Sequence, residues 1–316
     1  MALTANRERD AASLVDADSF EILHQLDFEL SAAGPAFSGD GQMVVGVSNR
    51  ETVLVYRVAG GELLGEYSNP NGVYKYAVFV PGSRTIFAGG NDGGYLLDAA
   101  TGEALRQFST PGASLYGANS AFVSVSPDGR YGAIHMWTPT GYNVVYLWDL
   151  QSGALKFRSS PKRDDVITAF AFSDDSHYVA WGGSSNIAYV RDLDDGAEVR
   201  RLPHLSPVLG IDFSSNNRFV LTSSLEDSVK VWDLETGEIV RQYYAGAGPA
   251  AFVEFVDDDD FILYTTQEDG IIHRQPLTID DLIETVCNTL QRDLTLEQRT
   301  VYGLDDTSTC PGAFGS

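Results

Sequence analysis

Short runs of apolar residues, separated by turns rich in Gly and Asp, follow one another along most of this chain. Five copies of one phrase carry the pattern: an apolar strand, a polar turn that ends in glycine, and a second strand. The copies are VLVYRVAGGELL (53–64), GYLLDAATGEAL (94–105), VYLWDLQSGALK (145–156), AYVRDLDDGAEV (188–199) and VKVWDLETGEIV (229–240). Their turn glycines, Gly61, Gly102, Gly153, Gly196 and Gly237, are 41, 51, 43 and 41 residues apart. A repeat of this length is typical of a solenoid or a propeller.

Each period has room for two further strands before the shared phrase. In the third period these are AFVSVS (121–126) and YGAIHM (131–136), and the phrase itself follows at 143–156. Alternation of apolar and polar positions favours β-strands, and the Gly, Asp, Asn and Pro residues between them suit tight hairpin turns. Each period therefore predicts a four-stranded antiparallel sheet. Such a sheet has two faces to bury, and radial stacking of the sheets buries both.

The two ends of the chain complement each other. The last period lacks a fourth strand, because sequence of helical character follows Leu277, while residues 15–26 have the form of the missing piece. A blade shared between the ends would close the ring and protect its edges. The sequence therefore predicts an all-β, closed β-propeller over residues 15–277, with six blades and seven as the alternative. Residues 1–14 are predicted to be a flexible segment.

Residues 278–316 differ in kind from the repeats. Thr278 with Asp281, and Thr295 with Gln298, have the spacing of helix caps, and apolar residues between them fall at helical intervals. We expect a short helical C-terminal extension, with two helices over 278–303 and a tail after them.

The charge balance restricts the partners. There are 21 Lys and Arg residues against 44 Asp and Glu, so the net charge is −23. Such a surface repels phosphate backbones and anionic membranes, and it suits a protein partner with a basic patch. Both an ordinary acidic protein and adaptation to high salt fit this composition. No apolar run reaches the roughly 18 residues of a membrane span, and no signal peptide is visible, so we expect a cytoplasmic protein, or an exported one if this chain is a fragment of a longer product. We also expect the propeller to be monomeric.

The phrases VYLWDL and VKVWDL, together with the PDG turn at 127–129, resemble WD-repeat β-propellers. Trp148-Asp149 and Trp232-Asp233 keep the pair after which that family is named, and the other copies replace it. The resemblance implies a hydrogen-bonded network of His, Ser or Thr, an acidic residue and Trp in each blade, which fixes the blade geometry. The fifth repeat matches this network most closely, with the residues His204, Ser223, Glu226 and Trp232.

The tail resembles the C-terminal extension of many bacterial WD-repeat proteins, in which an apolar helix with a cysteine precedes a later Thr-Cys-Pro. The matching residues are Cys287 and Thr309-Cys310-Pro311. This resemblance implies that Cys287 and Cys310 approach each other. They could form a disulfide, or they could be buried thiols, as is usual in a reducing compartment. Those bacterial proteins often combine the propeller with signalling domains, and no motif of such a domain occurs here.

Aromatic residues between the strands are the candidates for partner binding. Trp137 and Tyr142 lie in the longest insert, MWTPTGYN (136–143), which accounts for the 51-residue step. Large aromatic side chains in a Pro- and Gly-containing loop suit a partner-binding anchor, or they fold back over a blade edge. Further candidates fall in or beside the connections between blades: Tyr74, Tyr76, Tyr116, Tyr243 and Tyr244. Tyr suits binding surfaces, although each of these could instead pack on its own blade.

Motifs for catalysis or metal binding are lacking. The five histidines are scattered without the spacing of zinc ligands, and the run Asp257–Asp260 lacks the spacing of a calcium loop. No nucleophile elbow or phosphate-binding loop occurs. We therefore expect no catalytic site, metal or cofactor, and predict a non-catalytic scaffold for protein–protein interaction, with a role in bacterial signalling. The alternative is a propeller enzyme or small-ligand binder that uses the central channel.

Overall fold

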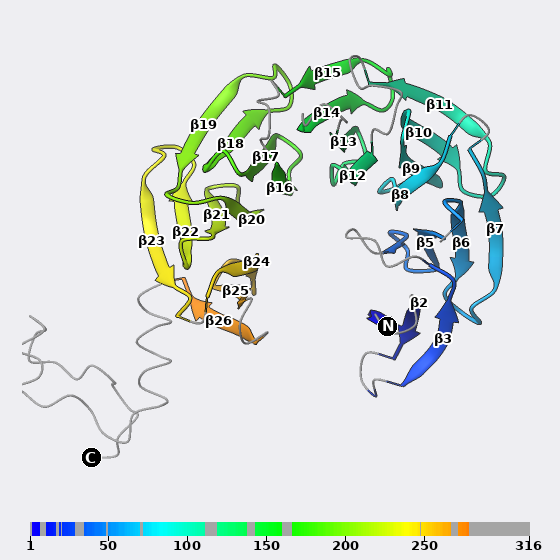
Figure 1. Cartoon of the computed structure of the whole chain (residues 1–316), viewed down its shortest axis with the longest axis horizontal. Coiled ribbons are helices and arrows are strands. Elements are labelled where there is room, and N and C mark those ends of the chain that lie inside the picture. Colours follow the sequence, from blue (N-terminus) through cyan, green and yellow to red (C-terminus); the bar gives the residue numbers. More distant parts are fainter. Residues whose placement is uncertain are drawn as a thin grey trace, which may run out of the picture. The chain divides into compact units, whose positions relative to one another are not determined.

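The computed structural model describes residues 2–6, 11–16, 19, 21–28, 35–48, 50–69, 72–110, 119–137, 143–159, 166–246, 248–266 and 271–277. The chain divides into two compact units, Met1–Val208 and Leu209–Ser316. Every regular element within the described ranges is a β-strand, and Figure 1 labels most of these strands, numbered in chain order. The helices predicted over 278–303, Cys287 and Cys310 lie outside the described residues.

The first unit contains five antiparallel sheets. The first sheet has three strands, β1 (Ala2–Asn6), β2 (Ala11–Val15) and β3 (Ile22–Leu26). The second has β4 (Ala36–Phe37), β5 (Met43–Val47), β6 (Val53–Arg57) and β7 (Leu63–Tyr67), and the third has β8 (Tyr74–Phe79), β9 (Thr85–Gly90), β10 (Gly93–Asp98) and β11 (Ala104–Ser109). The fourth has β12 (Asn119–Val125), β13 (Tyr131–Trp137), β14 (Asn143–Asp149) and β15 (Leu155–Arg158), and the fifth has β16 (Ile167–Phe172), β17 (Tyr178–Gly183), β18 (Ile187–Asp192) and β19 (Glu198–Pro203).

The second unit contains two sheets. One has four strands, β20 (Val208–Phe213), β21 (Phe219–Ser224), β22 (Ser228–Asp233) and β23 (Ile239–Tyr244), of which β20 begins at the last residue of the first unit. The other has three strands, β24 (Ala250–Val256), β25 (Phe261–Thr266) and β26 (Ile272–Pro276).

The prediction of six blades in a closed ring is wrong. The described residues form seven sheets, five with four strands and two with three. Residues 22–26, which were expected to complete the last sheet, pair with β2 in a sheet of their own. The physical reason is that Ala2–Asn6 and Ala11–Val15, which lie almost wholly in the segment 1–14 that was expected to be flexible, pair as β1 and β2 and so provide those partners. The architecture is all-β and propeller-like.

The acidic residue of the repeated phrase holds a turn together. Asp98, Asp149, Asp192 and Asp233 each accept the backbone N–H of the residue three positions later, at 2.8–3.2 Å. Their own carbonyl oxygens accept the N–H of the turn glycine at 2.8–3.1 Å. Those glycines have φ between 71° and 79°, which a residue without Cβ adopts at little cost. The repeated phrase is therefore the signature of one turn geometry.

A second recurring device lies in the turn between the first and second strands. Ser38, Ser126, Ser173 and Ser214 are buried, and each hydroxyl accepts the N–H of the first residue of the following strand at 2.8–2.9 Å. Each hydroxyl also donates to an Asp or Asn two residues later. We call the end of the sheets with these two kinds of tight turn the turn end, and the opposite end the loop end.

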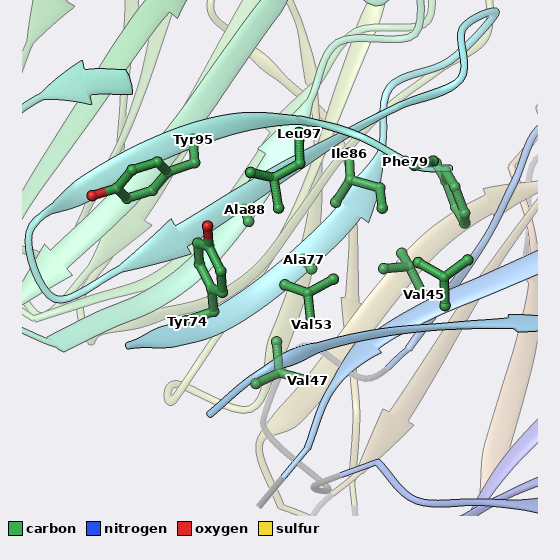
Figure 2. Close-up of a cluster of buried hydrophobic side chains, with 12 residues drawn as sticks. Val45, Val47, Val53, Tyr74, Ala77, Phe79, Ile86, Ala88, Tyr95 and Leu97 are labelled. Carbon is green, nitrogen blue, oxygen red and sulfur yellow. The ribbon is translucent and has the colours of Figure 1, made fainter. Parts of the chain in front are cut away.

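Apolar side chains between successive sheets form the core. The cluster between the second and third sheets appears in Figure 2, where Val45 and Val53 lie opposite Ala77 and Ile86. Similar clusters lie between the other neighbouring sheets of the first unit and between the two sheets of the second unit. Because both faces of an inner sheet are covered, strands such as β14 are buried along their whole length.

Candidate interaction site

The predicted partner-binding tyrosines occupy different environments. Tyr74 is 2% exposed, and its ring packs edge-on against Tyr95 at 5.5 Å between centroids (Figure 2). Burial, with a smaller contribution from Asp92, raises the pKa of Tyr74 to about 12. Tyr76 is half-buried against the core between the third and fourth sheets. Both side chains therefore contribute to the packing of the first unit.

In the second unit, the two neighbouring tyrosines at the end of β23 differ in exposure. Tyr243 is half-buried, its hydroxyl donates to the carbonyl oxygen of Pro276 at 2.7 Å, and burial raises its pKa. Tyr244 is 76% exposed. Among the predicted anchors whose side chains the structure describes, Tyr244 has the ring most open to a partner. Tyr116 and Tyr142 lie outside the described residues, and so does the side chain of Trp137, whose backbone ends β13.

In the predicted hydrogen-bond network of the sixth sheet, β20–β23, the hydroxyl that accepts the tryptophan N–H belongs to Thr222 and not to Ser223. The indole Nε1 of Trp232 donates to Oγ1 of Thr222 at 2.7 Å, while Ser223 is a neighbour on the other face of the strand. Glu226 accepts the hydroxyl of Ser228 at 3.0 Å and forms an ion pair with the buried Lys230. His204 belongs to the first unit, where it is buried and its backbone N–H donates to Asn186.

One acidic run, Asp257–Asp260, lies at the turn end of the second unit. Asp259, in the run Asp257–Asp260, accepts the hydroxyl of Ser215 at 2.7 Å, and Asp257 pairs with Arg274 at 2.7 Å. This run therefore joins its own turn to the preceding turn of the second unit. Among the residues that the structure describes, no three His, Cys, Asp or Glu side chains gather closely enough to hold a metal ion.

A cleft opens toward the loop end between the fourth and fifth sheets of the first unit. It encloses about 470 Å³. Its walls come from the first strands of both sheets and from the second strand of the fourth sheet. The lining residues are Phe122, Val123 and Ser124 of β12, His135 of β13, and Ile167, Thr168 and Phe170 of β16. The rings of Phe122 and Phe170 lie 5.2 Å apart between centroids and form one apolar wall. The hydroxyl of Thr168 donates to the carbonyl oxygen of Val208.

His135 is the titratable group among these residues. It is 2% exposed, and its Nε2 lies 2.9 Å from Oδ1 of Asn143, the first residue of β14. The two residues are diagonal neighbours on one face of the β13–β14 pair, because His135 pairs with Val145 and Trp137 pairs with Asn143. Burial lowers the pKa of His135 to about 4, and the bond to Asn143 only partly offsets this. The imidazole is therefore neutral at physiological pH.

The cleft includes His135, near the loop end of β13, the strand that leads in sequence into the insert. The strands β13 and β14 remain paired up to Trp137 and Asn143, so the connection at 138–142 begins one pair beyond the His135–Asn143 bond. The sequence prediction identified the insert but missed His135, which it counted among five scattered histidines. A signal was available, because His135 is the fifth residue of a second strand. The fifth residue is Val47, Gly89, Gly182, Ser223 or Thr265 in the other sheets that have this strand.

A second hollow, of about 500 Å³, lies at the turn end between the second and third sheets. Two of its polar side chains bond within one turn, since the hydroxyl of Ser38 donates to Asp40 at 2.7 Å and that carboxylate also accepts the N–H of Gln42 at 3.0 Å. The bond from Ser38 and then the bond from Gln42 hold the pKa of Asp40 below its usual value. This hollow is part of the turn geometry, in contrast to the cleft at the loop end.

Comparison with known proteins supports a WD-repeat propeller. The family model of the WD domain, G-beta repeat, matches residues 196–233, a stretch that ends at Trp232-Asp233. The COMPASS component SWD3 of Saccharomyces cerevisiae is 24% identical over 166 residues, which cover 52% of this chain and 51% of the yeast protein. WD repeat-containing protein 18 of Danio rerio is 28% identical over 188 residues, covering 55% of this chain and 40% of that protein. The chain thus spans about half or less of the length of these relatives.

The fold has a solved counterpart. The crystal structure of the computationally designed Ika8 protein superposes with a TM-score of 0.69 and 20% identity, covering 87% of this chain and 83% of that one. The relatives named above are eukaryotic, so they give no support to the bacterial part of the prediction. None of the described residues forms a helix of the length and apolarity that crossing a bilayer requires.

Proposed function

We propose that this chain is a non-catalytic scaffold that binds a partner protein through the loop end of its fourth and fifth sheets. The observation that carries this proposal is the difference between the two ends of the sheets. At the turn end the Ser and Asp side chains bond to their own turns, and this repeats from sheet to sheet. At the loop end of the fourth and fifth sheets, the described residues form a cleft walled by Phe122 and Phe170, and β13 leads in sequence into the insert.

The relatives agree with this role. The Danio rerio relative is named as a WD repeat-containing protein, and the yeast relative is named as a component of COMPASS. A loop-rich end that is presented by a rigid set of sheets is a common place for recognition, because loops can vary without disturbing the core. The bacterial signalling context is a further part of the proposal, and it is supported by the resemblance of the tail.

The partner is proposed to carry a basic surface. A net charge of −23 gives this chain a strongly negative field, which accelerates association with a positive patch and is screened by salt. Association should therefore slow when the salt concentration rises from about 0.05 M to about 0.5 M, where the Debye length falls well below 10 Å. A rate that does not depend on salt would contradict the basic partner while leaving the binding role intact.

The test uses the aromatic residues of the insert. The double variant Trp137→Ala, Tyr142→Ala should bind the partner that copurifies from the source organism at least ten-fold more weakly, since aromatic anchors dominate such interfaces. Leu105→Ala is the matched control, because Leu105 is exposed on the outer strand β11. Equal binding by wild type, control and double variant, measured by surface plasmon resonance, would reject the proposed function.

A further inference from the structure

His135 occupies a position at which the other sheets carry smaller side chains. The fifth residue of the second strand is Gly89 in the third sheet and Gly182 in the fifth, on either side of His135. In each of these three sheets it pairs with the first strand next to a bulge, where Tyr76, Phe122 and Ala169 are the partners. The backbone is therefore the same, and the imidazole is an addition to it.

One nitrogen of this imidazole has no hydrogen-bond partner within the part of the chain that the structure describes. Because the carbonyl oxygen of Asn143 can only accept, Nε2 carries the hydrogen and Nδ1 is left as an acceptor. No donor among the described residues reaches Nδ1, which is buried. A buried acceptor that has lost water without gaining a donor is destabilising, and such groups in native proteins call for an explanation. A ligand that supplies the donor is one such explanation.

The surroundings of His135 restrict the chemistry of that ligand. The cleft is lined by the aromatic rings of Phe122 and Phe170, by Val123 and Ile167, and by two hydroxyl side chains. None of the described lining residues carries a charge, so a charged group would lose hydration without finding a counterion. An aliphatic group would fill the space but would leave Nδ1 unpaired. A planar aromatic group with an N–H donor can stack on the phenylalanine rings and also donate a hydrogen bond to Nδ1.

We infer that the cleft between β12, β13 and β16 takes an indole side chain of the partner protein, with the indole N–H donating to Nδ1 of His135. This inference rests on the proposed function and adds the chemistry of the partner. An indole nitrogen is a donor only, which matches a lone acceptor among apolar walls. The cavity of about 470 Å³ is within the size range of sites that enclose a small aromatic group.

Entry of the indole requires one local movement. The ring of Phe122 packs against the imidazole at 5.1 Å between centroids, and it is half-buried, so we expect it to rotate when the indole enters. The backbone of β12 stays in place, because its pairing with β13 continues on both sides of this residue. The indole ring of the partner would then pack against Phe170 and replace part of the contact between Phe122 and Phe170.

The probe for this inference is indole, compared with 1-methylindole, which has the same rings but no N–H. With the full chain, ligand-observed NMR should show indole binding about ten-fold more tightly than 1-methylindole, as expected for a donor that satisfies a buried acceptor. In His135→Phe this preference should disappear, while binding of 1-methylindole stays within about two-fold. Equal affinities in the wild type, or no binding of either compound at millimolar concentration, would overturn the inference.

A second measurement decides the matter if His135→Phe does not fold. In wild type labelled with ¹⁵N on histidine, the Nδ1 resonance of His135 should shift on addition of indole and stay in place with 1-methylindole. Failure of the inference and failure of the proposed function are distinguishable. If partner binding is lost in Trp137→Ala, Tyr142→Ala but kept in His135→Phe, the inferred indole site is overturned and the proposed function stands. This conclusion holds even if free indole binds to the wild type.

Discussion

The fourth sheet, β12–β15, and the fifth sheet, β16–β19, follow one plan and differ at one end. Both pair the first residue of the second strand with the acidic residue of the repeated phrase, Tyr131 with Asp149 and Tyr178 with Asp192. At the turn end they also share the buried serine and the glycine turn. At the loop end, the second strand finishes with His135-Met136-Trp137 in the fourth sheet and with Gly182-Gly183 in the fifth.

The turn-end hydrogen bonds are common to both sheets, whereas the side chains at the loop end differ between them. The shared turn-end bonds are local, so any copy of the phrase can form them. At the loop end, the first strand of both sheets has a bulge in its pairing with the second strand, and the side chains there differ. In the fifth sheet the second strand ends with Gly182 and Gly183, and a Cβ at Gly183 would overlap the backbone of Val166. In the fourth sheet the two corresponding positions carry the buried side chains of His135 and Met136.

The largest expected effect comes from giving the fifth sheet a side chain at its loop end. A Cβ on Gly183 would overlap the carbonyl oxygen of Val166 and lie 2.8 Å from its carbonyl carbon, and backbone cannot move aside cheaply. Gly183→Ala should therefore lower the free energy of unfolding by about 3 kcal/mol. Urea unfolding followed by circular dichroism measures this change.

The matched control is Gly39→Ala, since a Cβ at Gly39 would meet nothing within 4 Å. Its midpoint should stay close to that of the wild type. If Gly183→Ala were as stable as Gly39→Ala, the loop ends of the two sheets would be equally permissive, and the comparison would lose its physical basis.

The same contrast explains which parts of the fold could be predicted. The strand phrases at 145–156 and 229–240 carry apolar alternation and turn glycines, and the structure places strands there. The N-terminal sheet was missed because Ala2–Asn6 shows no alternation and gains its place by pairing with β2. Sheet count depends on such pairing between distant or weakly patterned segments, which local pattern does not encode.

The site was predictable in part. Thr222 lies on the same face as Trp232, because Val220 pairs with Trp232 and side chains alternate along a strand. A period-two argument would therefore have chosen Thr222 over Ser223. The burial of Tyr74 against Tyr95 was beyond the sequence, since it depends on a contact between non-adjacent strands.

The buried imidazole makes the fourth sheet sensitive to acid. The pKa of His135 in the folded protein, about 4, is below its ordinary value of 6.5, so the unfolded chain binds the proton more readily between these values. Its contribution to stability is fully present above pH 6.5 and is lost as the pH falls toward 4, by about 3 kcal/mol in total. The charge would be unpaired, because the described residues that line the cleft are uncharged.

Thermal unfolding of wild type and His135→Phe between pH 7 and pH 4.5 tests this expectation. The wild type should lose stability more steeply than the variant over this range. Parallel curves for the two proteins would show that the imidazole is not held neutral by the fold, and the fourth sheet would then resemble the fifth in its response to pH.

The fifth position can also be compared in the second unit, where it is Ser223. Its hydroxyl finds no partner among the described residues, whereas the neighbouring Thr222 accepts the indole N–H of Trp232. Thr222→Val should cost about 1–2 kcal/mol, because it leaves that buried donor unpaired. Ser223→Ala should be neutral or slightly stabilising. Equal losses in the two variants, by urea unfolding, would mean that the two hydroxyls have equivalent roles.

The smallest effect is expected at the turn end, where the two sheets are alike. The carboxylate of Asp149 accepts the backbone N–H and the hydroxyl of Ser152, both at 2.8 Å, and that of Asp192 accepts the N–H of Asp194 at 2.8 Å. Asp149→Ala and Asp192→Ala should each lower the stability by about 1 kcal/mol, as for loss of a comparable cap. Glu103→Ala, at an exposed turn position of the third sheet, controls for removal of a negative charge.

For Asp149 the loss should also depend on pH. Burial alone would raise its pKa, but the bonds from Ser152 and from Arg130 outweigh burial and hold that pKa below the ordinary value of 3.8. Because the folded pKa is the lower one, the stabilisation is present above about pH 4 and is lost as the pH falls through the folded value. The difference between wild type and Asp149→Ala should therefore shrink below pH 4. A difference that stays constant down to pH 2.5 would show that the turn is held by its glycine and backbone bonds, and that the carboxylate contributes no pH-dependent stability.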